Sequence, residues 1–310
     1  MSIRWKSLGI ALLIILAGGV ARLPLEQRYT ENMRKQQLLD APLNVSMRDK
    51  LGQTFFLAVL GGFRSVVASL VELKALTAWQ YSNWGVVDEN YAICTSLQPR
   101  EEHYWEFRAH HLADNARDYY LLNSMLSDAS RHALGQQYVD KGIAVLREGL
   151  TWLPRSWKLC ERIAWYSSMP YTEKRNHAVA AEYYAKAFEA SGRRFLWRHH
   201  VYQVARIPER EREAWDKLIA LYEDDSGKDR TTTVEIELLY LYTVRGIYQR
   251  HPALKLPEPL FRLISPASLL TKEEKARAEW MRAKVTERAN PNAPRPKPPK
   301  VESPNLQKIK

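Results

Sequence analysis

Three side chains that can bind a metal ion recur at helical spacing in one short stretch of the sequence. His103 and His110 are seven residues apart and Asp114 follows four residues later, so a helix would place all three on one face. Catalytic zinc sites use a tighter set such as H-E-x-x-H or three convergent ligands, and no such motif occurs in the chain. We therefore expect neither a metal site nor another cofactor, although His103 and His110 remain candidates for binding.

Other sequence signatures of catalysis are missing as well. There is no G-x-S-x-G elbow and no glycine-rich phosphate loop, and the one Glu-Ser pair, Glu302-Ser303, lies close to the C-terminus. Paired carboxylates such as Asp224-Asp225 are typical of helix caps and turns. The sequence thus predicts a protein that is not an enzyme. An envelope enzyme with an unrecognised histidine or carboxylate site is the alternative.

Positive charge is concentrated at the two ends of the chain. The formal net charge is +11, yet residues 61–288 hold 33 basic and 30 acidic residues and are close to balanced. A nucleic-acid binder would carry a basic stripe on its folded domain. We therefore expect no nucleic-acid partner, while an adaptor for an anionic polymer, bound through the basic ends, is a further alternative.

The composition favours helices. Only 13 of the 310 residues are glycine, and 45% are hydrophobic, which is ample for a packed core. Cys94 and Cys160 are the only cysteines, and they fall in different predicted helix pairs. We expect both to be buried free thiols.

The N-terminus has the pattern of a membrane anchor or a signal segment. Arg4 and Lys6 precede an uninterrupted apolar run, 8–21, and Arg22 ends it. The run is shorter than the ~20 apolar residues of a typical span, but long enough for the hydrophobic part of a signal. We favour an uncleaved anchor within residues 1–24 and an exported body. A cleaved signal, a cytoplasmic body and a buried N-terminal helix are the alternatives.

A register of four positions repeats along the chain at intervals of 4, 3 and 5 residues. It places a small residue, a large one and a small one on a single helical face, so that a neighbouring helix can approach closely. A residue that ends helices follows, in most copies Pro or Gly. The four copies are Val87, Tyr91, Cys94, Pro99; Gly142, Leu146, Gly149, Pro154; Ala180, Tyr184, Ala187, Gly192; and Ala214, Leu218, Leu221, Ser226.

Each copy predicts the second helix of an antiparallel pair, whose first helix lies upstream. The helix-ending residues of successive copies are 55, 38 and 34 residues apart. The long first interval implies an insertion at 116–136. We therefore predict an all-α protein in which helix pairs stack into an α-solenoid over residues 63–250. The predicted first helices are 65–81, 104–115, 156–168, 195–207 and 232–250.

Further residues carry a closer likeness to known proteins. They are Leu60-Gly-Gly-Phe-Arg64, Trp79-Gln80, Leu97-Gln-Pro-Arg100, Trp105-Glu-Phe107, Leu112-Ala113 with Asn115, Gly142-Ile143 and Ala164-Trp165. With the register, they make the chain similar to the tetratricopeptide repeat family, and most similar to membrane-anchored bacterial proteins of that type without assigned activity. The resemblance is degenerate, and it departs from that group at His110-His111. It implies a TPR-like superhelix at the bacterial inner membrane, single-pass, with a periplasmic body.

The segment before the repeats is predicted to connect the anchor to the body. Residues 25–62 are expected to form juxtamembrane helices. Gly61 and Gly62 then permit a close turn, after which Arg64 opens the first repeat helix. We predict that these three residues form a structural joint.

The C-terminal part is predicted to consist of helices that cap the solenoid, followed by a disordered tail. Residues 251–289 are expected to be capping helices, the last of which begins with a capping box of Thr271 and Glu274. Residues 290–310 contain six prolines and are predicted to be a disordered basic tail.

Together these patterns predict a scaffold that binds a protein or peptide partner in a groove lined by the first helices. For every candidate contact the alternative role is packing within the repeat. The candidates are Trp79, Asn83, Trp105, Arg108, Asn115, Trp165 and Tyr202.

Overall fold

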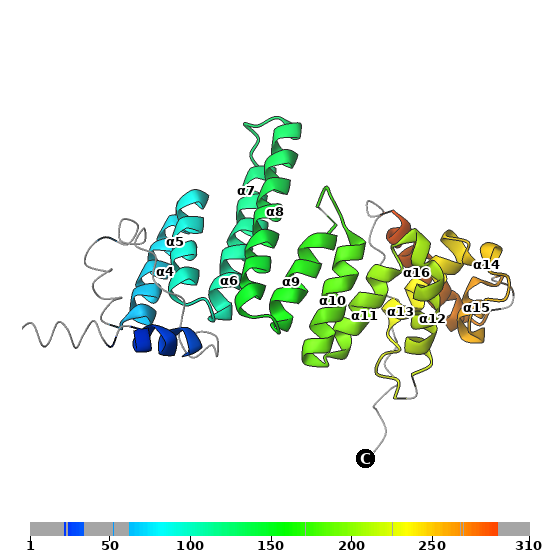
Figure 1. The fold of residues 1–310 in the computed structure, drawn as a ribbon. Helices are drawn as coiled ribbons and strands as arrows, with labels where there is room; N and C mark the ends of the chain where they lie inside the picture. Colours follow the sequence, from blue (N-terminus) through cyan, green and yellow to red (C-terminus); the bar gives the residue numbers. More distant parts are fainter. Residues whose placement is uncertain are drawn as a thin grey trace, which may run out of the picture. The chain divides into compact units, whose positions relative to one another are not determined.

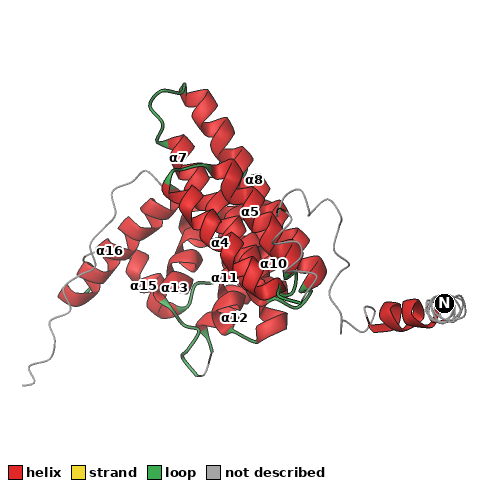
Figure 2. Ribbon diagram, turned by 90° about the vertical axis from the view of Figure 1, so that its left-hand side faces the viewer, coloured by secondary structure: helices red, strands yellow, loops and turns green. Residues whose placement is uncertain are grey.

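The fold is helical throughout the described part of the chain. The computed structural model describes residues 22, 24–33, 52, 62–170, 172–224, 226–266, 268 and 270–290. Within them Figure 2 shows helices and loops and no strand, so the all-α class is confirmed. Most of the predicted anchor (1–24) and nearly all of the predicted tail (290–310) lie outside the described residues. No described helix is long and apolar enough to cross a bilayer.

The chain divides into two compact units, Met1–Tyr104 and Trp105–Lys310. In the first, helices α4 (Arg64–Gln80) and α5 (Trp84–Leu97) pack side by side as an antiparallel pair (Figure 1). A tight turn joins them, with Ser82 in the left-handed region at φ 54°. The contact buries small and branched residues on both helices and one large residue, Tyr91 of α5. The others are Val67, Ala68, Val71 and Ala75 of α4 and Val87 and Cys94 of α5.

The second unit begins with one long helical run. It comprises most of α6 (Glu102–His110), the π-helical segment η1 (His111–Ala116) and α7 (Arg117–Leu121). α8 (Asp128–Trp152) returns antiparallel to it, and Figure 1 shows α7 and the start of α8 extending beyond the neighbouring helices. The expected insertion at 116–136 is therefore built mainly from extra helical turns.

The middle of the second unit continues with helices that each pack on the next. α9 (Trp157–Ser168) contacts α8 and α10 (His177–Ser191), and α10 contacts α11 (Arg194–Val204). The side chains of Ser127, Ser156 and Asn176 accept hydrogen bonds from backbone N–H groups and cap the starts of α8, α9 and α10. These caps explain why the predicted helix 156–168 agrees so closely with α9.

Two further helices follow, and the predicted helix 232–250 is broken. A short 3₁₀ turn, η2 (Pro208–Arg210), leads into α12 (Glu211–Tyr222), which packs against α13 (Thr232–Leu239). The π-helical η3 (Tyr240–Val244) then precedes Gly246, whose φ of 58° ends the helix before α14 (Ile247–Arg250). The prediction of a single helix over 232–250 was therefore wrong, because the chain breaks at Gly246.

The last helices fold back onto this part of the unit. α15 (Glu258–Ile264) packs against α16 (Lys272–Ala289), which also contacts α13 and η3. The predicted capping box is confirmed: Thr271 Oγ1 accepts from Glu274 N, and Glu274 Oε2 accepts from Thr271 N at 2.9 Å.

The repeating register is confirmed as a burial pattern. All twelve of its helical positions are buried, and α5, α8 and α10 end one to two residues before Pro99, Pro154 and Gly192. Only α12 ends earlier, four residues before Ser226.

Gly142 and Gly149 show why the register needs small residues. A Cβ at Gly142 would lie 2.7 Å from the Cβ of Ala113, and one at Gly149 would lie 2.9 Å from the ring of Trp105.

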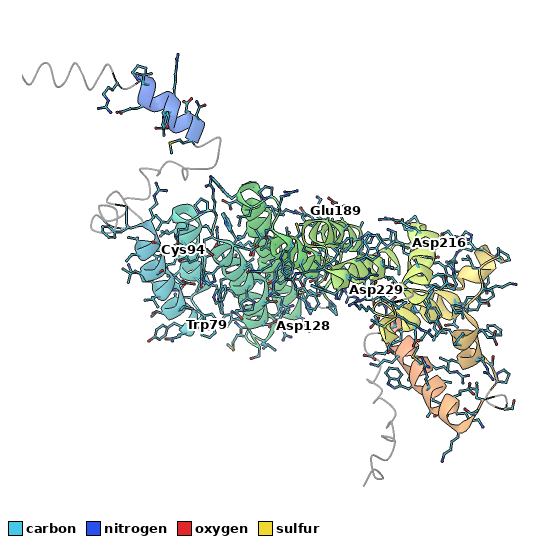
Figure 3. All side chains as sticks on the ribbon, turned by 90° about the horizontal axis from the view of Figure 1, so that it is seen from below. Trp79, Cys94, Asp128, Glu189, Asp216 and Asp229 are labelled. Carbon is cyan, nitrogen blue, oxygen red and sulfur yellow. The ribbon has the colours of Figure 1, made fainter. Side chains whose placement is uncertain are left out.

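Arginine clusters hold buried carboxylates in the second half of this unit. Asp229, labelled in Figure 3, accepts hydrogen bonds from Arg194 Nε and Arg198 Nη1, both at 2.6 Å. Glu211, Glu235 and Glu237 are buried in the same way, and each pairs with two arginines from other segments. Each carboxylate thereby cross-links parts of the chain that are distant in sequence.

Candidate functional site

Large apolar side chains are exposed on the first helices of the earlier pairs, from α4 to α9. In the described part of the chain, exposed large apolar residues occur on the first helices α4, α6, α7 and α9, and also on η3, α14 and α15 and in several turns. The second helices α8, α10 and α12 carry none and α5 carries only Val86, but the first helices α11 and α13 carry none either. On α4 they occupy the face opposite the contact with α5. On the earlier first helices these residues are Phe63, Val66, Leu70, Leu73, Leu76 and Trp79 near or on α4, Phe107 on α6, Tyr119 on α7 and Trp165 on α9.

Four of the predicted contact residues reach the surface. Trp79 is 42% exposed at the end of α4 (Figure 3), and Trp165 is 38% exposed on α9. Arg108 on α6 and Asn115 on η1 are half-buried. Trp165 and Arg108 lie in the second unit together with Phe107, a neighbour of Arg108 that was not among the predicted contact residues. Its exposure next to the buried Trp105 is the signal that identifies it.

The other three predicted contact residues have structural roles. Trp105 is only 2% exposed and packs against Gly149 and Leu159, so it belongs to the core. Tyr202 is buried among α11, α12 and α13, and its hydroxyl lies 3.2 Å from Thr231 Oγ1. Asn83 caps α5 by accepting a hydrogen bond from Val86 N. Trp105 and Tyr202 fill the space between helices, so at these two positions the packing role prevails over the groove role.

A hydrogen-bonded set of polar side chains lies on the π-helical segment η1. His110 Nδ1 is 2.8 Å from Asp114 Oδ2, and the hydroxyl of Tyr166 on α9 donates to the same oxygen at 2.7 Å. Burial alone would raise the pKa of Asp114, but the hydrogen bonds from His110 and Tyr166, with the charge of nearby Arg117, lower it overall. Asp114 is therefore a carboxylate that joins η1 to α9.

This set resembles the orienting half of a hydrolase, in which a carboxylate fixes an imidazole that activates a nucleophile. In the described part of the chain, Asp114 is the only residue whose polar atoms bond the imidazole of His110, so no hydroxyl or thiol is placed for activation. Tyr166 is wholly buried, and burial followed by the charge of Asp114 raises its pKa above the ordinary value. We interpret the set as a structural link with one half-exposed histidine.

The adjacent histidine is held neutral. His111 is buried, and its Nδ1 lies 2.9 Å from the amide Nδ2 of Asn115, which can only donate a hydrogen bond. The ring nitrogen must then accept, which requires an unprotonated imidazole. Burial, and after it the charge of His110, lowers the pKa of His111 to about 4. Asn115 is thus half-buried and also stabilises the π-helical turn through its hydrogen bond to His111.

The remaining metal and thiol candidates do not form a cluster. His103 Nε2 lies 2.7 Å from Glu72 Oε1 within the first unit. Among the described residues there is no group of three or more histidine, cysteine or acidic side chains arranged to hold a metal ion. Cys94 and Cys160 are buried free thiols, as predicted, and burial raises their pKa values to about 12 and about 11. Such thiols are poor nucleophiles and poor metal ligands.

The predicted joint is only partly described. Gly61 lies outside the described residues. Gly62 has a φ of 90°, which only glycine adopts readily, and Arg64 is the first residue of α4. A turn therefore does precede α4 at the predicted position.

Comparisons with known proteins provide no assignment. No family model, no curated protein and no solved structure matches the chain. The resemblance to tetratricopeptide repeats therefore stays a prediction that depends on the repeating register. Function must be inferred from the chain's own surface and packing.

Proposed function

We propose that this protein is a non-enzymatic, TPR-like scaffold that binds a protein or peptide partner at the bacterial cell envelope. The observation that carries the proposal is that the first helices α4, α6, α7 and α9 expose large apolar side chains, whereas their partners α8 and α10 expose none and α5 exposes only Val86. Contiguous exposed apolar surface is typical of interaction sites, whereas scattered single residues are not. This asymmetry between the two helices of the earlier pairs supports a binding role for their first helices.

The packing order supports a stacked arrangement. From α8 to α13 every helix contacts the next one along the chain, as expected when each pair buries its apolar face against its neighbours. The buried register and the close approach at Gly142 support the same interpretation. We propose that these pairs form a TPR-like solenoid whose first helices line the partner-binding face.

The N-terminal sequence supports membrane attachment. The apolar run 8–21 with flanking basic residues favours an anchor within residues 1–24 and a periplasmic body. Protease treatment of intact spheroplasts provides the measurement, with a cytoplasmic protein as the control. Degradation of the body only after lysis would contradict a periplasmic location.

The partner surface can be tested by site-specific photo-crosslinking in native membranes. A photoreactive amino acid at Phe107 or Trp165 should give discrete crosslinked products with the full-length chain, because both side chains are exposed on first helices. The matched control is the exposed Glu189 on the second helix α10 (Figure 3), which should give none of these products. Mass spectrometry of the products identifies the partner.

Affinity for the identified partner then separates contact residues from bystanders. The double variant Phe107→Ala with Trp165→Ala should weaken binding at least about tenfold, since aromatic anchors dominate interface energetics. Glu189→Ala should bind normally. Undiminished binding by the double variant, or equal crosslinking from Glu189, would show that the first-helix face is not the site.

A further inference from the structure

An apolar pocket opens on the second unit between η3, α15 and α16. Its cavity volume is about 300 Å³, at the lower end of the range of about 300–1,000 Å³ for small-molecule sites. Its floor is formed by side chains that the rest of the fold has buried. These are Leu239, Leu263, Met281 and Val285.

The rim contains hydroxyl groups that are already engaged. Thr243 Oγ1 donates to Leu239 O at 2.7 Å, and Thr286 Oγ1 donates to Arg282 O at 3.0 Å. Neither hydroxyl therefore offers its proton to a ligand. A peptide backbone inserted into the pocket would leave its own polar groups largely unpaired, which is unfavourable, whereas an alkyl chain has no such groups.

One cation, Arg282, completes the rim. Its Nη2 donates to Leu263 O at 3.2 Å and to Ser265 O at 3.0 Å, which places the guanidinium at the end of α15. No carboxylate of the described residues pairs with Arg282, unlike the arginines around Glu211, Asp229, Glu235 and Glu237. The N–H groups at Nε and Nη1 of Arg282 remain, and either can donate a charged hydrogen bond to a carboxylate.

We propose that this pocket binds a single-chain aliphatic carboxylate, of the fatty-acid class, with its alkyl chain on the apolar floor and its carboxylate at Arg282. The volume fits one chain rather than two. The basic, proline-rich sequence 290–310 is a poor occupant, because it brings positive charge to Arg282 and few apolar side chains. The proposal does not depend on the partner surface of the first helices.

The test uses the full-length protein in its native membrane and two photoreactive probes. One is decanoic acid carrying a diazirine, and the other is the corresponding alcohol. After irradiation, mass spectrometry should locate adducts of both probes on the floor or rim of the pocket, with excess decanoate competing. Adducts that map elsewhere, or that decanoate does not displace, would overturn the proposal.

Four variants, one of them a control, separate the charge from the cavity. Arg282→Met should reduce labelling by the acid about tenfold and leave labelling by the alcohol unchanged, because only the acid gains a charged hydrogen bond. Arg262→Met is the matched control, since Arg262 is an exposed arginine of α15 outside the pocket. Val244→Trp and Thr286→Phe enlarge two lining side chains, one on η3 and one on α16, and each should block both probes.

Each contrary result has a defined meaning. Equal labelling of Arg282→Met and the parent by the acid would show that Arg282 recognises no head group. Loss of both probes in Arg282→Met would show that the arginine only maintains the end of α15. Competition by an amphipathic leucine-containing peptide but not by decanoate would assign the pocket to a protein partner instead. Circular dichroism and thermal unfolding establish that Arg282→Met, Val244→Trp and Thr286→Phe are folded.

Discussion

Arg288 Nε on α16 donates a hydrogen bond of 2.8 Å to Glu237 Oε1 on α13, 51 residues earlier in the chain. Arg206 Nη2, from the segment after α11, reaches the same oxygen at 3.2 Å. The carboxylate is 2% exposed, so the two arginines supply almost all of the stabilisation that water would otherwise provide. One carboxylate therefore joins three segments of the second unit.

Replacement of Glu237 by Ala should be strongly destabilising. The change leaves Arg206 and Arg288 without their shared carboxylate, and breaking a buried pair in this way costs about 3–5 kcal/mol of the free energy of unfolding. Urea denaturation of the full-length protein, followed by circular dichroism, provides the measurement.

Glu279→Ala is the matched control for this change, because Glu279 is an exposed glutamate on α16. It should alter the unfolding free energy by no more than about 0.5 kcal/mol. Equal midpoints for Glu237→Ala and Glu279→Ala would show that the buried cluster contributes nothing to stability.

Gly142→Ala should destabilise the pair of η1 and α8, although alanine is the better helix former. The new Cβ would lie 2.7 Å from Ala113 Cβ and 3.1 Å from the carbonyl oxygen of Ala109. We expect a net loss of about 1–2 kcal/mol, because the overpacking outweighs a gain in helix propensity of about 1 kcal/mol. Thermal and urea unfolding measure the change.

Two further variants test the cause. Gly85→Ala adds the same atom where the nearest neighbouring atom is 4.0 Å away, so it should be neutral or stabilising. Adding Ala113→Gly to Gly142→Ala removes the nearer of the two close contacts and should recover part of the stability. If the double variant is no more stable than Gly142→Ala, the contact with the Cβ of Ala113 is not the cause of the destabilisation.

The sequence was sufficient for the parts of the fold that depend on local spacing. Register residues spaced four and then three positions apart predicted the buried faces of α5, α8, α10 and α12, because helical geometry alone places such residues on one face. It was insufficient where tertiary contacts decide. Glu237 has no local partner that marks it as buried, and the π-helical turns η1 and η3 have no simple sequence pattern.

The candidate site shows the same division. The exposed Trp165 and the buried Trp105 both occur on first helices, and the residue type does not distinguish them. What separates them is which face meets the next helix, and that depends on the approach permitted by Gly149. Aromatic residues at repeat positions thus predicted the relevant helices, whereas the structure was needed to show which of them can meet a partner.

His111 should make the protein less stable in acid. Its pKa is lowered from 6.5 to about 4 in the folded state, chiefly by burial, so the unfolded chain binds the proton more readily. The stabilising contribution is complete above about pH 6.5 and is lost as the pH falls toward about 4. It should amount to about 2 kcal/mol between about pH 7 and about pH 5.

His111→Leu should remove this part of the pH dependence, because leucine is neutral at every pH and stays buried. Unfolding free energies at the two pH values give the measurement, and His132→Leu, at an exposed histidine of α8, is the control that should keep the full dependence. If His111→Leu loses as much stability in acid as the parent protein, the imidazole accepts a proton without disturbing η1. The hydrogen bond from Asn115 would then not require a neutral ring.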